Sequence, residues 1–92
     1  MSGDIKNCYG ELFESIVKLN SVEDCELFFR DLCTIKELDS MTQRIKAAKL
    51  LLDGETYEQI IAKTEISSAT LSRVSRCVKN GKGYKKFIDI SK

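Results

Sequence analysis

The 92-residue sequence contains no histidine and no proline, and it has only five glycines. The lack of histidine removes the most frequent general acid or base of enzyme active sites and a common zinc ligand. No pair of carboxylates is clustered, and no glycine-rich phosphate loop occurs. These absences exclude the residue constellations of common enzymes, so the sequence predicts a protein that is not an enzyme and that has no cofactor.

The absence of proline has a second consequence, because proline breaks helices. With 32% charged and 42% hydrophobic residues, the composition favours long uninterrupted helices over a fold rich in loops. The length suits a single domain spanning residues 1–92, since domains typically have about 50 to 250 residues. A chain this short buries only about 60–65% of the surface that its unfolded form exposes, and oligomerisation often makes up such a shortfall.

Four cysteines, Cys8, Cys25, Cys33 and Cys77, form no CxxC pair and have no histidine to complete a zinc site. Their wide spacing does not resemble a disulfide framework, although it leaves a single bridge open. Each has apolar neighbours at helical spacing, which predicts buried free thiols in a reducing compartment. The start, MSGDIKN, lacks the features of a signal peptide, and no apolar run could span a membrane. We therefore expect a cytoplasmic protein that binds no metal and contacts no membrane.

The net charge of +1 is unevenly distributed. Residues 1–54 carry seven basic and ten acidic side chains, a net charge of −3, whereas residues 55–92 carry eight basic and four acidic ones, a net charge of +4. From Ser67 to Lys86 there are six basic residues and no acidic residue. A solvated helix face normally mixes both signs, so this segment indicates a polyanionic partner.

Apolar residues recur every three or four positions in segments separated by capping signals, which predicts helices. The first helix carries apolar positions from Ile5 to Leu19, and Ser21 with Asp24 resembles a capping box for a second helix that reaches Leu32. These helices, residues 1–33, carry more apolar surface than one thin bundle can bury, which predicts a homodimer built on residues 5–32.

A long central helix is expected over residues 34–54. Thr34 and Glu37 fit a capping box at its start, and Gly54 is suited to end it in a left-handed turn. Its expected apolar face comprises Leu38, Met41, Ile45, Ala48 and Leu52.

Residues 56–80 are predicted to form a helix-turn-helix, that is, two short helices joined by a tight turn. Thr56 with Gln59 caps the first helix, whose apolar side is Ile60 and Ile61, and Ser67 caps the second, which ends at Asn80-Gly81. A last helix is expected within residues 83–92, from about Tyr84 to Ile90, and closes the chain with Phe87 and Ile88 as its apolar residues. The predicted architecture is all-α, with about six helices.

The second helix of this pair has the side chains needed to enter the DNA major groove. Ile66, Leu71, Val74 and Val78 form a stripe that can pack on the first helix. Small residues at the N-terminal end allow close approach, and long cationic side chains further along can reach base edges or phosphates. The candidate DNA-binding residues are Ser67, Ser68, Ala69, Thr70, Ser72, Arg73, Arg76 and Lys79.

Glu65 lies where such a turn usually has glycine. A left-handed conformation there would cost glutamate about 1 kcal/mol, and a carboxylate near phosphates opposes binding, so a turn of another shape remains open.

Three alternatives to DNA binding also stay open: an amphipathic helix on a simple bundle, a protein-binding adaptor of the transcription apparatus, and RNA binding. Tyr84 and Phe87 are the only aromatic residues that interleave with the basic residues, so few side chains are present on which the bases of single-stranded RNA could stack.

From about Asp31 to Ile88 the chain resembles the bacterial tryptophan repressor family, and within it the repressor-like proteins of Gram-positive bacteria. The resemblance is carried by the Thr34 start, by Arg44, by Asp53-Gly54-Glu55 and by Ala69-Thr70-Leu71-Ser72-Arg73. It implies an all-α dimer with interlocked N-terminal helices that represses transcription by binding an operator.

The family's corepressor pocket, carried over by position, would comprise Arg44, Arg73, Val74 and Cys77. Arg44 and Arg73 match the two arginines on either face of the bound indole. Members that bind tryptophan have glycine at the position of Val74 and serine at that of Cys77, and their turn before the basic helix is about one residue longer. The valine side chain would fill the space that glycine leaves open. We therefore expect no tryptophan binding, and whether another small molecule acts as effector stays open.

Overall fold

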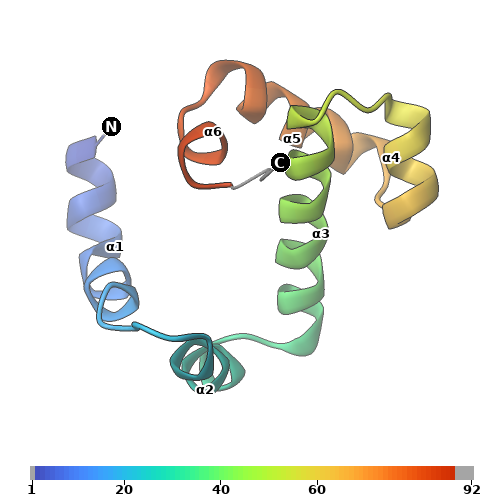
Figure 1. Ribbon diagram of the computed structural model, residues 1–92. Coiled ribbons are helices and arrows are strands. Elements are labelled where there is room, and N and C mark those ends of the chain that lie inside the picture. Colours follow the sequence, from blue (N-terminus) through green and yellow to red (C-terminus); the bar gives the residue numbers. More distant parts are fainter. Residues whose placement is uncertain (1, 89–92) are drawn as a thin grey trace. The chain divides into compact units, whose positions relative to one another are not determined.

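The computed structural model describes the backbone of residues 2–88 and the side chains of residues 8–88 (Figure 1). Its described part is all-α and contains six helices and no strand, which confirms the predicted fold class. None of these helices is both long enough and apolar enough to cross a lipid bilayer. The helices are α1 (Ser2–Ile16), α2 (Val22–Leu32), α3 (Ile35–Leu52), α4 (Tyr57–Thr64), α5 (Ser68–Asn80) and α6 (Gly83–Phe87).

The chain divides into two compact units, Met1–Thr34 and Ile35–Lys92. In the first unit, α1 ends at Ile16, three residues before the predicted end at Leu19. The amide of Leu19 donates to the carbonyl of Ile16 at 3.0 Å, a tight turn that replaces the last helical bonds.

Ser21 caps α2 as expected, since its hydroxyl accepts a hydrogen bond from the amide of Asp24 at 3.0 Å. The reciprocal bond differs from a standard capping box. The Asp24 carboxylate accepts from the amide of Asn20 at 3.2 Å, one residue before the cap.

None of the described side chains of residues 8–34 is buried. Cys8 and Cys25 are exposed and Cys33 is partly exposed, as free thiols, and Cys77 of the second unit is also free and exposed. The prediction of buried cysteines is therefore wrong for the single chain. For the three cysteines of the first unit the physical reason is that two helices alone cannot cover both of their apolar stripes, whereas Cys77 lies on α5 outside its buried stripe. The exposed large apolar side chains of this unit are Tyr9, Leu12, Phe13, Val17, Val22, Leu27 and Leu32.

The second unit holds the hydrophobic core, in which α3, α4 and α5 pack together (Figure 1). Two fully buried alanines of α3 contribute small side chains, which allow neighbouring helices to approach closely. Leu50, Leu51, Leu52 and Tyr84 pack against this core as partly buried side chains. The buried apolar residues are Ala47, Ala48, Ile60, Ile66, Leu71, Val74 and Val78.

Two residues that we expected to face the core do not. Ile45 is 46% exposed and Ile61 is 36% exposed. On α3 the buried stripe is centred between Ala47 and Ala48, so that Ile45 lies to its side. On α4 only Ile60 and Thr64, four residues apart, are buried.

Gly54 ends α3 in a left-handed conformation, φ 91°, as predicted. The amide of Glu55 donates to the carbonyl of Leu50 and the amide of Gly54 to that of Leu51, both at 3.0 Å. These two bonds constitute a Schellman motif, which satisfies carbonyls that the helix end would leave unpaired. At the other end, α3 begins at Ile35, directly after Thr34.

The C-terminal helix α6 is shorter than expected. Ile88 is extended, with φ −90° and ψ 118°, and its amide donates to the carbonyl of Tyr84, so the helix ends at Phe87. Phe87 is 76% exposed. The part of the expected helix over residues 89–92 lies outside the described residues.

Gly81 and Gly83 provide a matched test of the junction between α5 and α6. A Cβ at Gly81 would lie 2.7 Å from the carbonyl oxygen of Cys77, whereas one at Gly83 would meet nothing within 4 Å. We expect Gly81→Ala to lower the free energy of unfolding by about 1–3 kcal/mol, because the helix end must move, and Gly83→Ala to leave it unchanged or slightly higher. Thermal denaturation measures both, and equal midpoints for the two variants would contradict this account.

Candidate nucleic-acid interface

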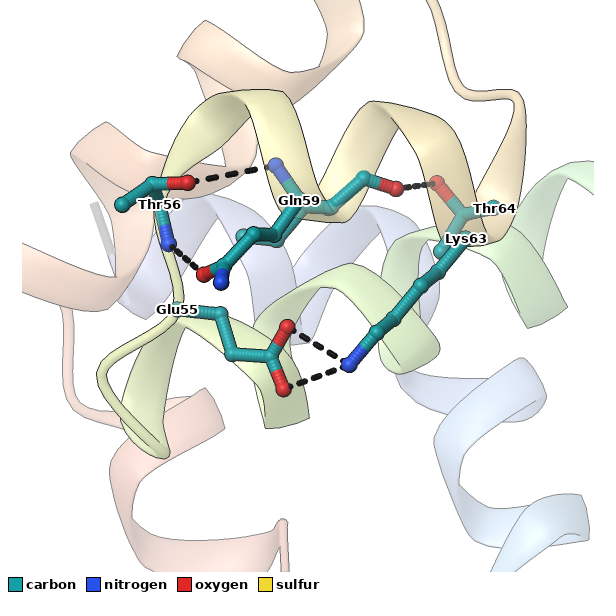
Figure 2. A network of polar contacts seen from close by, with 6 residues as sticks. Glu55, Thr56, Gln59, Lys63 and Thr64 are labelled. Atoms are coloured by element: carbon teal, nitrogen blue, oxygen red, sulfur yellow. Dashed lines mark hydrogen bonds and ion pairs between the residues drawn. The ribbon is translucent and has the colours of Figure 1, made fainter.

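The start of α4 is fixed by a complete capping box, visible in Figure 2. The hydroxyl of Thr56 accepts from the amide of Gln59 at 3.2 Å, and the Gln59 side-chain oxygen accepts from the amide of Thr56 at 2.9 Å. Lys63, near the other end of α4, lies 2.8 Å from both carboxylate oxygens of Glu55. This ion pair joins α4 to the turn after α3, and together these contacts set the position of the first helix of the helix-turn-helix (Figure 2).

Thr64, the last residue of α4, organises the turn that leads into α5. Its hydroxyl donates to the carbonyl of Ile60 at 2.8 Å and accepts from the amide of Ile66 at 3.2 Å. Its carbonyl accepts from the side-chain amide of Gln43 on α3 at 3.2 Å. The turn is thus tied to α4, to the residues that follow and to the long helix. Sequence patterns did not indicate Gln43 or Thr64, because neither residue belongs to a capping motif.

Glu65 occupies the turn in a left-handed conformation, with φ 61° and ψ 20°. The alternative of a turn of another shape is therefore wrong. Its amide donates to the carbonyl of Ile61 at 2.9 Å, so the backbone is satisfied although the conformation costs about 1 kcal/mol for a residue with a side chain. The carboxylate is exposed and forms no hydrogen bond or ion pair with the described residues.

Ser67 caps α5 as predicted. Its hydroxyl accepts from the amide of Thr70 at 3.1 Å and donates to the Thr70 hydroxyl at 2.9 Å. Of this pair, only the Thr70 hydroxyl retains a free proton to donate to a ligand such as a phosphate. Ser67 and Thr70, both candidate DNA-binding residues, thus form the hydrogen bonds that cap the start of α5.

The two faces of α5 differ sharply. Leu71, Val74, Ser75 and Val78 are buried and form the inner face. Ala69, Arg73, Arg76 and Asn80, spaced by four, three and four residues, are exposed and form the outer face. Ser68, Ser72 and Lys79 are exposed beside this face. The outer face thus begins with small side chains and continues with cationic ones.

One of the nearby lysines has a structural contact. The Lys85 ammonium donates to the carbonyl of Lys79 at 3.2 Å, where a cation is favourable against the negative end of the helix dipole. Lys82 and Lys86 are exposed at the same end of α5, and Lys86 lies 5.5 Å from the ring centroid of Phe87. Positive charge therefore continues past the end of the outer face.

The four residues of the expected effector pocket have different environments. Val74 is only 1% exposed and belongs to the core, so its side chain fills space between the helices. Arg44 is partly buried, whereas Arg73 and Cys77 are exposed. Within the described part of the chain, no cluster of acidic or cysteine side chains could hold a metal ion.

Comparison with known proteins identifies the family. The sequence model of the Trp repressor protein family matches residues 8–91. The chain belongs to the Trp repressor family. The uncharacterized protein YerC of Bacillus subtilis (strain 168) is 48% identical over 71 residues, which cover 77% of this chain and 68% of YerC. The resemblance deduced from the sequence is thereby confirmed.

Two solved structures support the same assignment within the Trp repressor family. A candidate Trp repressor from Staphylococcus aureus superposes with a TM-score of 0.84 at 39% identity and covers 90% of this chain and 84% of its own. A TrpR-like protein from Eubacterium eligens ATCC 27750 gives a TM-score of 0.84 at 38% identity, over 91% of this chain and 89% of its own.

The burial of Val74 yields a prediction about the effector. We expect calorimetry to detect no micromolar binding of tryptophan to the parent protein, because the buried Val74 side chain fills space that a bound ligand would need. Cys77→Ser alone should not create binding, since Val74 remains in place. Val74→Gly with Cys77→Ser tests the steric argument if circular dichroism shows that the variant folds. Tryptophan binding by the parent would refute the prediction.

Proposed function

We propose that this chain is a sequence-specific DNA-binding transcription regulator that acts as a repressor. The helix from Ser67 to Lys79 would enter the major groove of operator DNA. The observation that carries the proposal is the outer face of α5, with small side chains at its start, cations further along and no acid, opposite a buried apolar face. Membership in a family of DNA-binding regulators supports it.

Charge supports the same proposal. No Asp or Glu occurs between Ile66 and Ile88, while Arg73, Arg76 and Lys79 lie on or beside the outer face. Neutralising phosphates releases counterions from DNA, so such a surface gains affinity for duplex DNA at low salt. The free amides in the first turn of α5 add a favourable field for a phosphate.

The side chains of α5 divide into two expected roles. Ser68, Ala69 and Ser72, at the N-terminal end, are placed to meet base edges and to set the preferred sequence. Arg73 is suited to a bidentate contact with guanine, and Arg76, a turn further on, to a phosphate. Lys79 and the lysines that follow would contact phosphates and carry no sequence information.

We further propose that the regulator is a homodimer built on α1 and α2. The described side chains of residues 8–34 include seven exposed large apolar residues and none that is buried. A surface of this kind is usually covered by a partner, and two-fold symmetry would present two α5 helices to successive turns of the DNA.

A protein-binding adaptor is the second candidate function. Tyr57 and Ile61, four residues apart on α4, are 41% and 36% exposed and form an apolar surface beside the helix-turn-helix. Salt separates the two functions, because binding to DNA weakens steeply as salt rises, whereas an apolar protein contact does not.

Arg73→Ala and Lys79→Ala test DNA binding. On duplexes selected by the parent from a random pool, Arg73→Ala should cost about 1–3 kcal/mol at one base pair. Lys79→Ala should weaken binding to selected and scrambled duplexes alike and lower the salt slope by about one unit. Lys36→Ala, an exposed lysine on α3, is the control. If both variants bind as the parent does at every salt concentration, the outer face does not touch DNA and the adaptor function is favoured.

Light scattering tests the dimer. We expect the mass of a dimer at micromolar concentration for the parent, and a shift toward monomer for Phe13→Glu, because a charge on α1 would be buried in the interface. Phe13 is 45% exposed in the single chain. Phe87→Glu on α6, at an even more exposed phenylalanine, is the matched control and should leave the dimer intact. A monomeric parent would disprove the proposed assembly.

A further inference from the structure

Glu65 is an unfavourable residue for the place that it occupies. It adopts a left-handed conformation that glycine would adopt without strain, and its carboxylate has no partner among the described residues. The side chain therefore adds no contact that stabilises the turn. A strained residue whose side chain does nothing for the fold points to a function.

The left-handed conformation does not depend on the identity of the Glu65 side chain. The residue before it, Thr64, is held by the bonds of its hydroxyl to Ile60 and Ile66 and by the bond of its carbonyl to Gln43. The amide of Glu65 is itself bonded to the carbonyl of Ile61 at 2.9 Å. None of these bonds involves the Glu65 side chain, so Gln or Gly at position 65 should leave the turn intact.

The position of Glu65 along the chain is also specific. It lies two residues before Ser67, the cap of α5, at the end of α5 whose small residues would meet base edges under the proposed function. It is the last acidic residue before the segment from Ile66 to Ile88, which has none. Its exposed carboxylate is therefore the negative charge closest in sequence to the N-terminal end of α5.

We propose that Glu65 limits the affinity of α5 for DNA. Its carboxylate opposes the attraction of Arg73, Arg76 and Lys79 for phosphates, so that binding rests less on charge and more on contacts with bases. The inference depends on the proposed DNA binding. Since salt screens charges separated by more than about 8 Å at physiological ionic strength, the effect should be greatest at low salt.

Two substitutions separate the charge from the strain. Glu65→Gln removes the charge and keeps the strained backbone, whereas Glu65→Gly removes both. We expect each variant to bind selected and scrambled duplexes roughly two- to five-fold more tightly than the parent at low salt, with a steeper loss of affinity as salt rises. Only Glu65→Gly should also raise the thermal midpoint, by about 4–8 °C.

Asp39→Asn provides the matched control. It makes the same change of charge on an exposed residue of α3, two turns before the buried pair Ala47 and Ala48 that shares the core with α5. This variant has the same net charge as Glu65→Gln, so it separates an effect of position 65 from an effect of net charge, and it should bind DNA less tightly than Glu65→Gln.

The outcomes distinguish this inference from the function on which it rests. A parent that binds no duplex at any salt concentration overturns the proposed function and the role of Glu65 together. If the parent binds duplex DNA and Glu65→Gln binds it with the same affinity as Asp39→Asn, the proposed function stands and only the role of Glu65 is overturned. Weaker binding of Glu65→Gln to the selected duplex would mean that the carboxylate favours binding, which also overturns it.

Discussion

The packing of α5 against α3 is the constraint on which the rest of the second unit depends. Ala47 and Ala48 of α3 are fully buried in the same core as Leu71 and Val74 of α5, and small side chains let packed helices approach closely. Such close packing fixes the rotation of α5 about its own axis, because turning it would expose the apolar stripe and bury cations. The direction of the outer face, with Arg73 and its neighbours, thus follows from the apolar stripe rather than from any contact of the cations themselves.

Besides the rotation of α5, the turn before this helix fixes the point at which the helix starts. Thr64 receives a hydrogen bond from Gln43, a residue 21 positions earlier on α3, so the same helix that supplies the core also holds the turn. Core and turn together define both the rotation and the starting point of α5. A groove-binding helix needs both to be fixed, since an error in either would move its side chains away from the bases that they read.

Features that depend on neighbouring residues could be predicted from the sequence. The caps at Ser21, Thr56 and Ser67 and the left-handed turn at Gly54 are set within a few residues, and the structure contains all of them. Features set by distant residues could not. The periodicity of α3 indicated an apolar stripe but not its centre, so that Ile45 was placed in the core instead of Ala47. The bond between Gln43 and Thr64 has no local sequence signal.

The environment of Val74 links the fold to the question of regulation. Its side chain is 1% exposed and belongs to the core shared by α3 and α5. A ligand that merely replaced the core contacts of Val74 would add little to the stability of α5. It could change DNA binding only if it bound one conformation of the protein more tightly than another. The chain itself therefore supplies the packing that positions α5, and under the proposed function any regulation of DNA binding would act elsewhere, on charge or on assembly.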